Sequence, residues 1–300
     1  MIRLSIIIVS WNTRELLGSC LASICRHSPP FPFEVIVVDN ASVDGSPGLV
    51  RRDFPAVRLV ENPANLGFAA ACNRGAATAA GDFLLFLNSD TLVHAGTLHG
   101  ALSFMERNPG AGVMGCRTLD RDGAPQGTAL GFPTPTRIFA NVSGMSRMLR
   151  LSRLRGHRRR RSADYIQGSF LVIAKRVFAS CHGFDERFFL YGEDADLCLR
   201  VRAAGMSIEY DPAFTITHQG GGSSAEPVMR LDHFITGCLQ LYAKHRAPRQ
   251  RKRLAAVIRS ALALRLLAGL LAAPEDFRRR KRETVEMFRR LAAGESKGGA

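Results

Sequence analysis

The sequence predicts an α/β fold with a mostly parallel central sheet, followed by a helical C-terminal extension. The N-terminal third alternates short apolar runs with amphipathic stretches, an order that produces parallel strands joined by right-handed crossovers. Polar residues directly follow the apolar runs, at the edge where such sheets bind ligands. From Glu226 onward the pattern is helical and rich in basic residues.

Four apolar runs among the first ninety residues have the length of buried strands, and the stretches between them have helical periodicity. The predicted strands are Leu4–Val9, Glu34–Val38, Val57–Val60 and Phe83–Leu87. The predicted helices are Thr13–Arg26, Ser46–Phe54 and Gly67–Ala79.

The second half is less regular. Residues 110–161 are predicted to be rich in loops, with Asp122-Gly123 as a hairpin turn. Further predicted elements are a strand over Tyr165–Ala174, a helix over Glu193–Ala204, and short strands at Ile208–Tyr210 and Phe214–Thr217.

Composition limits the class of protein. A chain of 300 residues with 46% hydrophobic and 22% charged residues can bury a large core unaided. Its seven cysteines form no C-x-x-C pair, which disfavours a disulfide framework or structural zinc site and favours a reducing compartment. The apolar run within Met1–Ser10 is too short for a signal peptide or membrane span. We therefore expect a cytoplasmic protein.

The formal charge of +15 is concentrated in three blocks, residues 147–161, 246–253 and 278–282. Such blocks bind nucleic acid or an anionic membrane surface, or they are simply exposed to solvent. A nucleic-acid-binding protein is the weaker reading, because interleaved aromatic residues and a recognised binding motif are lacking. Leu254–Ala273 is apolar and about as long as a span, but Arg259 and Arg265 interrupt it. We expect an interfacial helix on an anionic membrane; a buried helix of a C-terminal bundle is the alternative.

Polar side chains gather where three predicted strands end. Asp90 could ligate a divalent cation that neutralises a diphosphate leaving group. The alternative is that these residues cap helices and make turns. They are Ser10, Trp11 and Asn12, then Asp39 and Asn40, then Asn88, Ser89 and Asp90.

A second acidic cluster, Glu193, Asp194 and Asp196, opens a predicted helix. Helix capping accounts for at least one of the three. Mutual repulsion raises carboxyl pKa values, which favours one of them as a general base. His218, followed by glycines 220–222, is a candidate metal ligand beside a loop or else a structural histidine.

Asn65 to Ala69 opens the third predicted helix, where Gly67 allows close backbone approach and the N–H groups can bind phosphate. The segment matches neither G-x-G-x-x-G nor the P-loop, which disfavours a Rossmann dehydrogenase and a P-loop NTPase. The hydrolase patterns G-x-S-x-G and H-E-x-x-H are also lacking from the sequence.

Together these segments resemble the GT-A-fold glycosyltransferases of family 2, especially the bacterial rhamnosyltransferase-like branch. The resemblance covers about residues 4 to 223. The matching blocks are Ser5–Asn12, Val37–Ser42, Asn65–Ala69 through Asn73, Leu87–Thr91, Gly183–Tyr191, Glu193–Arg200 and His218–Ser223.

The resemblance implies a GT-A domain over residues 1–223, with a nucleotide-sugar-binding half (1–90) and an acceptor-binding half (91–223), and an extension over 224–300. It implies Asp194 as catalytic base, assisted by Glu193, and a Mg²⁺ or Mn²⁺ ion at Asp90 and His218. The implied nucleotide-sugar-binding residues are Ser10, Asn12, Asp39, Asn65, Gly67, Asn73, Asn88, Ser89 and Asp90.

The implied activity is inverting transfer of L-rhamnose from dTDP-rhamnose to a hydroxyl of a lipid-linked saccharide or cell-surface glycan. The alternative donor is a UDP-hexose or UDP-N-acetylhexosamine. The implied location is peripheral, on the inner face of the cell membrane. Two residues depart from the family pattern. Asn88 stands where an aspartate is common, which leaves Asp90 as the only carboxylate of the metal motif, and Gly192 stands where a bulkier residue is frequent.

Overall fold

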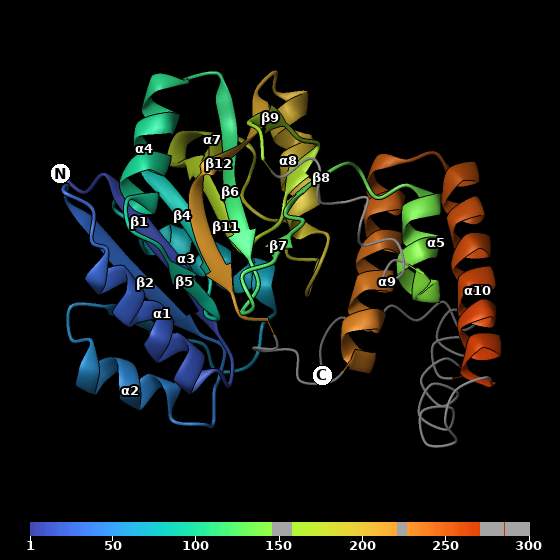
Figure 1. The fold of residues 1–300 in the computed structure, drawn as a ribbon, viewed down its shortest axis with the longest axis horizontal. Coiled ribbons are helices and arrows are strands. Elements are labelled where there is room, and N and C mark those ends of the chain that lie inside the picture. Colours follow the sequence, from blue (N-terminus) through green and yellow to red (C-terminus); the bar gives the residue numbers. More distant parts are fainter. Residues whose placement is uncertain (146–157, 221–226, 271–284, 286–300) are drawn as a thin grey trace.

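The computed structural model describes residues 1–145, 158–220 and 227–270, together with Val285. One mixed sheet with helices on both faces forms the main body, and helices α5, α9 and α10 stand beside it (Figure 1). The sequence expectations for residues 147–157, 221–226, 271–284 and 286–300 lie outside the described residues.

The sheet has the order β3-β2-β1-β4-β11-β6-β12-β5. The first four strands in this order are parallel, β11 is antiparallel to both of its neighbours, and β12 is parallel to β6. The main strands are β1 (Leu4–Ser10), β2 (Phe33–Asp39), β3 (Arg58–Glu61), β4 (Phe83–Asn88), β5 (Thr91–Val93), β6 (Ala111–Leu119), β11 (Phe170–Ala174) and β12 (Ser207–His218). Short strands are β7 (Pro125–Gln126), β8 (Ala129–Leu130), β9 (Arg161–Ser162) and β10 (Tyr165–Ile166).

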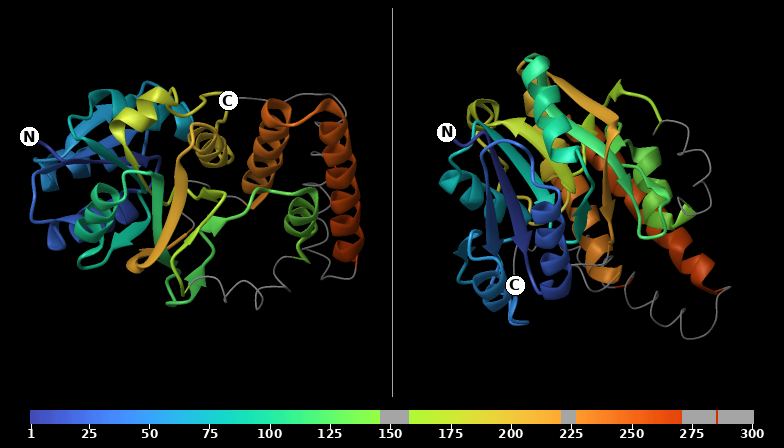
Figure 2. Two further views of the ribbon diagram at one scale, coloured as in Figure 1. Left: turned by 90° about the horizontal axis from the view of Figure 1, so that it is seen from above. Right: turned by 60° about the vertical axis from the view of Figure 1, so that its left-hand side comes forward.

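Helices cover both faces of the sheet, and each face has its own apolar core (Figure 2). One core includes side chains of α1 (Arg14–Arg26), α2 (Ser46–Asp53) and α4 (Thr97–Arg107). The other includes side chains of α3 (Phe68–Thr78), α7 (Lys175–Ser180) and α8 (Glu193–Ala203). Because the strands are apolar on both sides, the sheet is buried between two helical layers.

The predicted strands and helices of the first ninety residues are confirmed, with ends shifted by at most one residue. The prediction that residues 110–161 are rich in loops is wrong, because this region contains β6 and α5 (Pro135–Ser143). The hairpin turn at Asp122-Gly123 is confirmed by the antiparallel pairing of β6 with β7. The predicted strand over Tyr165–Ala174 is divided into β10 and β11. The last two predicted strands form one strand, β12, interrupted between Asp211 and Thr215.

The helices α9 (Pro227–His245) and α10 (Pro248–Leu270) pack with α5 around a third apolar core (Figure 1). Leu254, Ile258 and Leu262 of α10 are buried there. On this side α10 is therefore a buried helix of a C-terminal bundle, which was the alternative to an interfacial helix. Its outer side exposes basic residues and Leu267, which is 60% exposed. Among the described helices, none combines the length and apolar character needed to cross a membrane.

Candidate active site

The carboxyl ends of β1, β2 and β4 bring the predicted polar cluster to one edge of the sheet. Ser10 pairs with Asp39, and Val9 with Asn88, in the parallel register. A chain of buried hydroxyls joins two of these ends: Ser10 Oγ lies 3.0 Å from Thr13 Oγ1, which donates to Ser89 Oγ at 3.0 Å. The Ser10 and Ser89 hydroxyls thus link the ends of β1 and β4 through Thr13, and both already have hydrogen-bond partners inside the protein.

Asp39 is the buried carboxylate at the end of β2, with 2% of its surface exposed. Its Oδ2 accepts a hydrogen bond from the Ser42 backbone N–H at 2.8 Å, whereas Oδ1 is buried and has no partner among the described residues. A buried acceptor without a partner is costly, so an N–H or O–H donor of a ligand would complete it. Asn12, with a φ of 53°, holds the same loop by accepting from Val43 N–H at 2.8 Å.

The start of α3 lies beside this loop. Asn65 Oδ1 accepts from Gly67 N–H at 3.0 Å, and Asn40 Nδ2 donates to the Gly67 carbonyl at 3.1 Å. A Cβ atom on Gly67 would lie 2.6 Å from the Phe189 carbonyl oxygen, which also accepts from Phe68 N–H at 2.7 Å. Gly67 is therefore required in this structure because the segment before α8 lies against its backbone. The same segment accepts the hydrogen bond of one N–H at the start of α3, that of Phe68.

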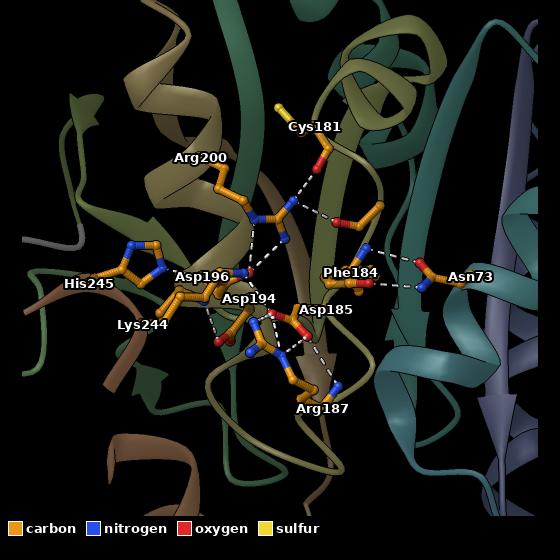
Figure 3. Close-up of polar contacts among 12 residues, drawn as sticks. Asn73, Cys181, Phe184, Asp185, Arg187, Asp194, Asp196, Arg200, Lys244 and His245 are labelled. Carbon is orange, nitrogen blue, oxygen red and sulfur yellow. Dashed lines mark hydrogen bonds and ion pairs between the residues drawn. The ribbon is translucent and has the colours of Figure 1, made fainter. Parts of the chain in front are cut away.

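Asn73 also serves that segment. Its Oδ1 accepts from Phe184 N–H at 2.9 Å, and its Nδ2 donates to the Phe184 carbonyl at 2.8 Å (Figure 3). The same Nδ2 also donates to Glu186 Oε1 at 2.9 Å. These bonds occupy both ends of the amide. Asn73 therefore holds residues 184–186 against α3, and its place at the nucleotide site stays a prediction from resemblance.

His218 reaches Asp90 through the antiparallel register of β5 and β12, in which His218 pairs with Thr91. The His218 Nε2 atom lies 3.1 Å from Asp90 Oδ1 and 3.2 Å from Asn88 Nδ2. On the other side of the ring, Nδ1 lies 3.0 Å from Gln126 Oε1. Two sequence candidates for a metal site are thus brought together.

Gln126 fixes the tautomer of His218. Its Nε2 donates to the His218 carbonyl at 3.0 Å, so its Oε1 must face Nδ1, which therefore carries the proton. In the neutral ring, Nε2 then presents a lone pair close to the Asp90 carboxylate, an arrangement that a cation between the two atoms would stabilise. Two ligands at right angles, each about 2.1 Å from Mg²⁺, are roughly 3 Å apart, close to the 3.1 Å observed.

The donor set fits a cation that shares its coordination with a ligand. Among the residues that the structure describes, no group of three or more His, Cys, Asp or Glu side chains could hold a metal. Asp90 and His218 supply two protein atoms, and Mg²⁺ commonly completes such a site with substrate phosphates and water.

Asp194 lies in the first turn of α8 and lines a small pocket of about 60 Å³. Its Oδ1 accepts from Ala195 N–H at 2.7 Å and its Oδ2 from Gly168 N–H at 3.3 Å. Burial raises the pKa of its carboxyl to about 6, although these N–H groups favour the charged form. A carboxylate with such a pKa can accept a proton near neutral pH.

The other two acids of the cluster have different surroundings. Glu193 is 4% exposed, and burial together with the Asp194 charge raises the pKa of its carboxyl well above the usual value. Its charge in turn helps to raise the pKa of the Cys72 thiol on α3, so it lies toward the interior of the fold. Asp196 is fully buried and paired with Arg200, Lys244 and His245 (Figure 3). Asp196 is therefore structural, but through buried ion pairs and not through the helix capping expected of at least one member of the cluster.

Sequence reasoning missed the residues that connect the two halves of the site. The Asn88 N–H contacts the Ser169 carbonyl at 3.4 Å, and the preceding Gly168 donates to Asp194. The segment 168–169 thus joins the strand end of β4 to the helix start of α8. Gln126 was missed as well, because only the pairing of distant strands places it beside His218.

Comparison with known proteins gives one extensive family match. The family model described as Glycosyl transferase family 2 matches residues 5–178, and a second, described as the N-terminal domain of galactosyltransferase, matches residues 151–219. The chain is 29% identical over 303 residues to an N-acetylglucosaminyl-diphospho-decaprenol L-rhamnosyltransferase of Mycobacterium tuberculosis, covering 94% of this chain and 98% of the relative. It is 44% identical over 55 residues to the rhamnosyltransferase WbbL of Escherichia coli, covering 18% of this chain and 21% of that protein.

Solved structures share the fold at low sequence identity. The mannosyltransferase PcManGT of Pyrobaculum calidifontis, in complex with GDP-Man and Mn²⁺, has a TM-score of 0.60 at 20% identity, over 97% of this chain and 86% of that one. GalNAc-T7 with UDP, GalNAc and Mn²⁺ has a TM-score of 0.59 at 14% identity, over 81% of this chain and 48% of that one. The fold is thus that of GT-A glycosyltransferases, as the sequence resemblance implied.

Proposed function

The chain belongs to glycosyl transferase family 2, and from this premise we propose that it transfers L-rhamnose from dTDP-rhamnose to a hydroxyl of a lipid-linked saccharide, with inversion at the anomeric carbon. The observation that carries the proposal is the placement of a proton acceptor next to a candidate diphosphate–metal site. The segment 168–169 contacts both Asn88 and Asp194. A nucleotide sugar bound at the strand ends would therefore present its anomeric carbon toward the Asp194 pocket.

The proposed mechanism assigns one step to each part of the site. Asp39 and the start of α3 bind the nucleoside and diphosphate. Asp194 removes the proton from an acceptor hydroxyl as that oxygen attacks the anomeric carbon in line. The bond to the diphosphate breaks in the same step, so no covalent sugar–enzyme intermediate is needed.

Asp90 and His218 would hold a divalent cation, Mg²⁺ or Mn²⁺. When bound, such a cation neutralises charge that develops on the departing diphosphate. Gln126 keeps His218 in the tautomer that offers Nε2 to it, and Asn88 places a neutral amide nitrogen 3.2 Å from the same Nε2. Mn²⁺ is bound in both similar glycosyltransferase structures, which supports the assignment.

The finer identity of donor and acceptor is supported by the relatives. The Mycobacterium tuberculosis protein is named for L-rhamnose as the transferred sugar and for N-acetylglucosaminyl-diphospho-decaprenol as the acceptor. The match extends over almost the whole of both chains. We therefore propose a rhamnosyl donor and a polyprenyl-diphosphate-linked acceptor.

Calorimetry with dTDP, UDP and GDP, each with and without Mn²⁺, tests the donor class. We expect dTDP to bind most tightly and Mn²⁺ to strengthen its binding. Asp39→Ala should weaken dTDP binding by about ten- to a hundredfold, because it removes a buried acceptor worth roughly 1.5–3 kcal/mol. Preferred binding of UDP would select the alternative donor, and equal binding by Asp39→Ala would place the nucleoside elsewhere.

We also propose that the outer side of α10 contacts an anionic membrane, on which a lipid-linked acceptor would reside. Arg249, Lys252, Arg253 and Arg259 are exposed there, and each basic residue near such a surface contributes about 1 kcal/mol. Replacing both Arg253 and Arg259 with Glu, which reverses their charge, should reduce co-sedimentation with phosphatidylglycerol vesicles by about tenfold or more. The matched control reverses the exposed Arg26 and Arg74 of the α/β body. An equal loss in the two double variants would indicate binding by net charge alone.

A further inference from the structure

Helix α9 forms one wall of the Asp194 pocket. The pocket is lined on one side by Tyr165, Tyr191 and Asp194, and on the other by residues of α9. Those residues are Phe234, Gly237, Cys238 and Leu241. The charge of Asp194 adds to burial in raising the pKa of the Cys238 thiol to about 12, which agrees with their closeness.

Gly237 brings the backbone of α9 against the turn that begins α8. A Cβ atom on Gly237 would lie 2.0 Å from the Tyr191 carbonyl oxygen, and one on Gly192 would lie 3.2 Å from the Gly237 carbonyl oxygen. The turn has positive φ at both Tyr191 (68°) and Gly192 (102°). Because Asp194 follows this turn by two residues, the position of α9 and the position of Asp194 are linked.

The last turn of α9 is fastened to α8 by the buried Asp196 carboxylate. Lys244 Nζ lies 2.8 Å and His245 Nε2 2.6 Å from Asp196 Oδ1, and Arg200 Nε donates to Oδ2 at 2.9 Å (Figure 3). Lys244 also pairs with Asp185 at 2.6 Å. Removing a partner from a fully buried carboxylate leaves an uncompensated charge, so these contacts hold α9 strongly.

The pocket residues and the fastening residues lie on one side of α9. Counted along the chain, each of these residues follows the previous one by three, one, three, three and one positions, so all of them lie on one stripe of the helix. They are Phe234, Gly237, Cys238, Leu241, Lys244 and His245. The adjacent side of the helix, with Ile235 and Tyr242, packs in the three-helix core with α5 and α10, and Cys238 and Phe234 also contact this core.

We propose that α9 is the acceptor-side wall of the active site, that Phe234 contacts the acceptor, and that Gly237, Lys244 and His245 are positioning residues that hold this wall opposite Asp194. The inference rests on the proposed function in taking Asp194 as the base. An aromatic and aliphatic wall facing a single carboxylate suits the C–H-rich edge of a sugar whose hydroxyl points to Asp194, and the pocket of about 60 Å³ admits that edge and not the whole ring. The helical bundle then belongs to the catalytic unit, whether or not it also contacts a membrane.

The test compares two glycine substitutions in the full chain. Gly237→Ala must displace α9 or the turn, whereas Gly48→Ala in α2 meets open space and only removes a helical glycine. With N-acetylglucosaminyl-diphospho-decaprenol and dTDP-rhamnose as probes, Gly237→Ala should lower kcat/KM for the acceptor by about a hundredfold, the cost of roughly 1 Å of misplacement. The Kd for dTDP should stay within twofold, and Gly48→Ala should match the parent.

A second readout needs no acceptor. The pKa of Asp194, followed by carboxyl ¹³C NMR and assigned by its loss in Asp194→Asn, should fall from about 6 toward the ordinary value in Gly237→Ala, because water enters a displaced wall. Phe234→Ala, which opens the same wall, should produce the same fall and provides the test if Gly237→Ala does not fold. The titratable groups facing Asp194 are Tyr165, Glu193, Cys198 and Cys238.

The outcomes separate the two proposals. An unchanged Asp194 pKa and unchanged acceptor kinetics in Gly237→Ala and Phe234→Ala would overturn the role of α9. A parent enzyme that makes no product from these probes would contradict the proposed donor and acceptor, while the pKa readout would still decide whether α9 walls the pocket.

Discussion

Asp194→Asn should lower turnover about a thousandfold, within the range by which general-base catalysis accelerates reactions. Asn has nearly the same shape, and its side-chain oxygen can still accept a hydrogen bond from Ala195 or Gly168, but it cannot take a proton from the acceptor hydroxyl. Binding of dTDP should change little, because Asp194 lies in the pocket lined by α9. Measurement of kcat and of the dTDP dissociation constant on the same preparation checks both statements.

The pH dependence gives an independent check. Since the base must be ionised and its pKa is about 6, kcat/KM of the parent should rise as pH increases through 6 and reach a plateau above 7. Because the carboxyl has an ordinary pKa of 3.8 in the unfolded chain and about 6 in the folded protein, the free energy of unfolding falls as pH rises from about 4 to 6 and stays lower above that range. Asp194→Asn should therefore be more stable than the parent at pH 7.5, by about 3 kcal/mol, and about equally stable at pH 4. Parent-like turnover, or loss of stability at both pH values, would contradict this role.

Asp90→Ala should abolish the dependence of donor binding on Mn²⁺ and reduce kcat/KM about a hundredfold, because the diphosphate then departs without a neutralising charge. The measurement is dTDP binding with Mn²⁺ and with a chelator. His218→Ala should have the same direction of effect, since its Nε2 lies 3.1 Å from Asp90 Oδ1.

Gln126→Glu offers a matched control for the tautomer argument. A carboxylate at position 126 still accepts from Nδ1 but cannot donate to the His218 carbonyl, so metal-dependent binding should weaken less than in His218→Ala. Equal binding of dTDP by Asp90→Ala with Mn²⁺ and with chelator, at the affinity of the parent, would exclude the metal site.

The sequence was most informative where strands are buried on both faces. Leu4–Ser10 and Phe83–Asn88 are continuous apolar runs followed by polar residues, so both the strands and the ligand-binding edge could be predicted. The strand β6 was missed because Gly112 and Gly115 interrupt its pattern. In the fold these glycines make room for neighbours, since added Cβ atoms would lie 2.2 Å from Val201 and 2.3 Å from Ile166. A loop and a closely packed strand have the same sequence signature here.

The residues of the site could be predicted from the sequence better than the role of each residue. Asp39, Asp90, Asp194 and His218 could be singled out, and the structure brings Asp90 and His218 together. Asn73 could not be separated from ligand-binding residues, because its partners lie more than a hundred positions away in the chain. The wall contributed by α9 had no sequence signal, since Phe234 and Gly237 fit an ordinary amphipathic helix and their pairing with Tyr191 is purely tertiary.

The insertion of α5 between α9 and α10 has a consequence for how the protein is made. A ribosome adding 5–20 residues per second delivers α5 on the order of ten seconds before both of its partner helices. During that interval Ile138 and Val142, fully buried in the finished protein, have nothing to pack against. The nascent chain thus carries an exposed apolar helix until α9 and α10 have been synthesised, and exposed apolar surface of this kind promotes aggregation of unfinished chains. Substitutions that weaken α9 or α10 would then lower the yield of folded protein in cells before they alter the finished enzyme.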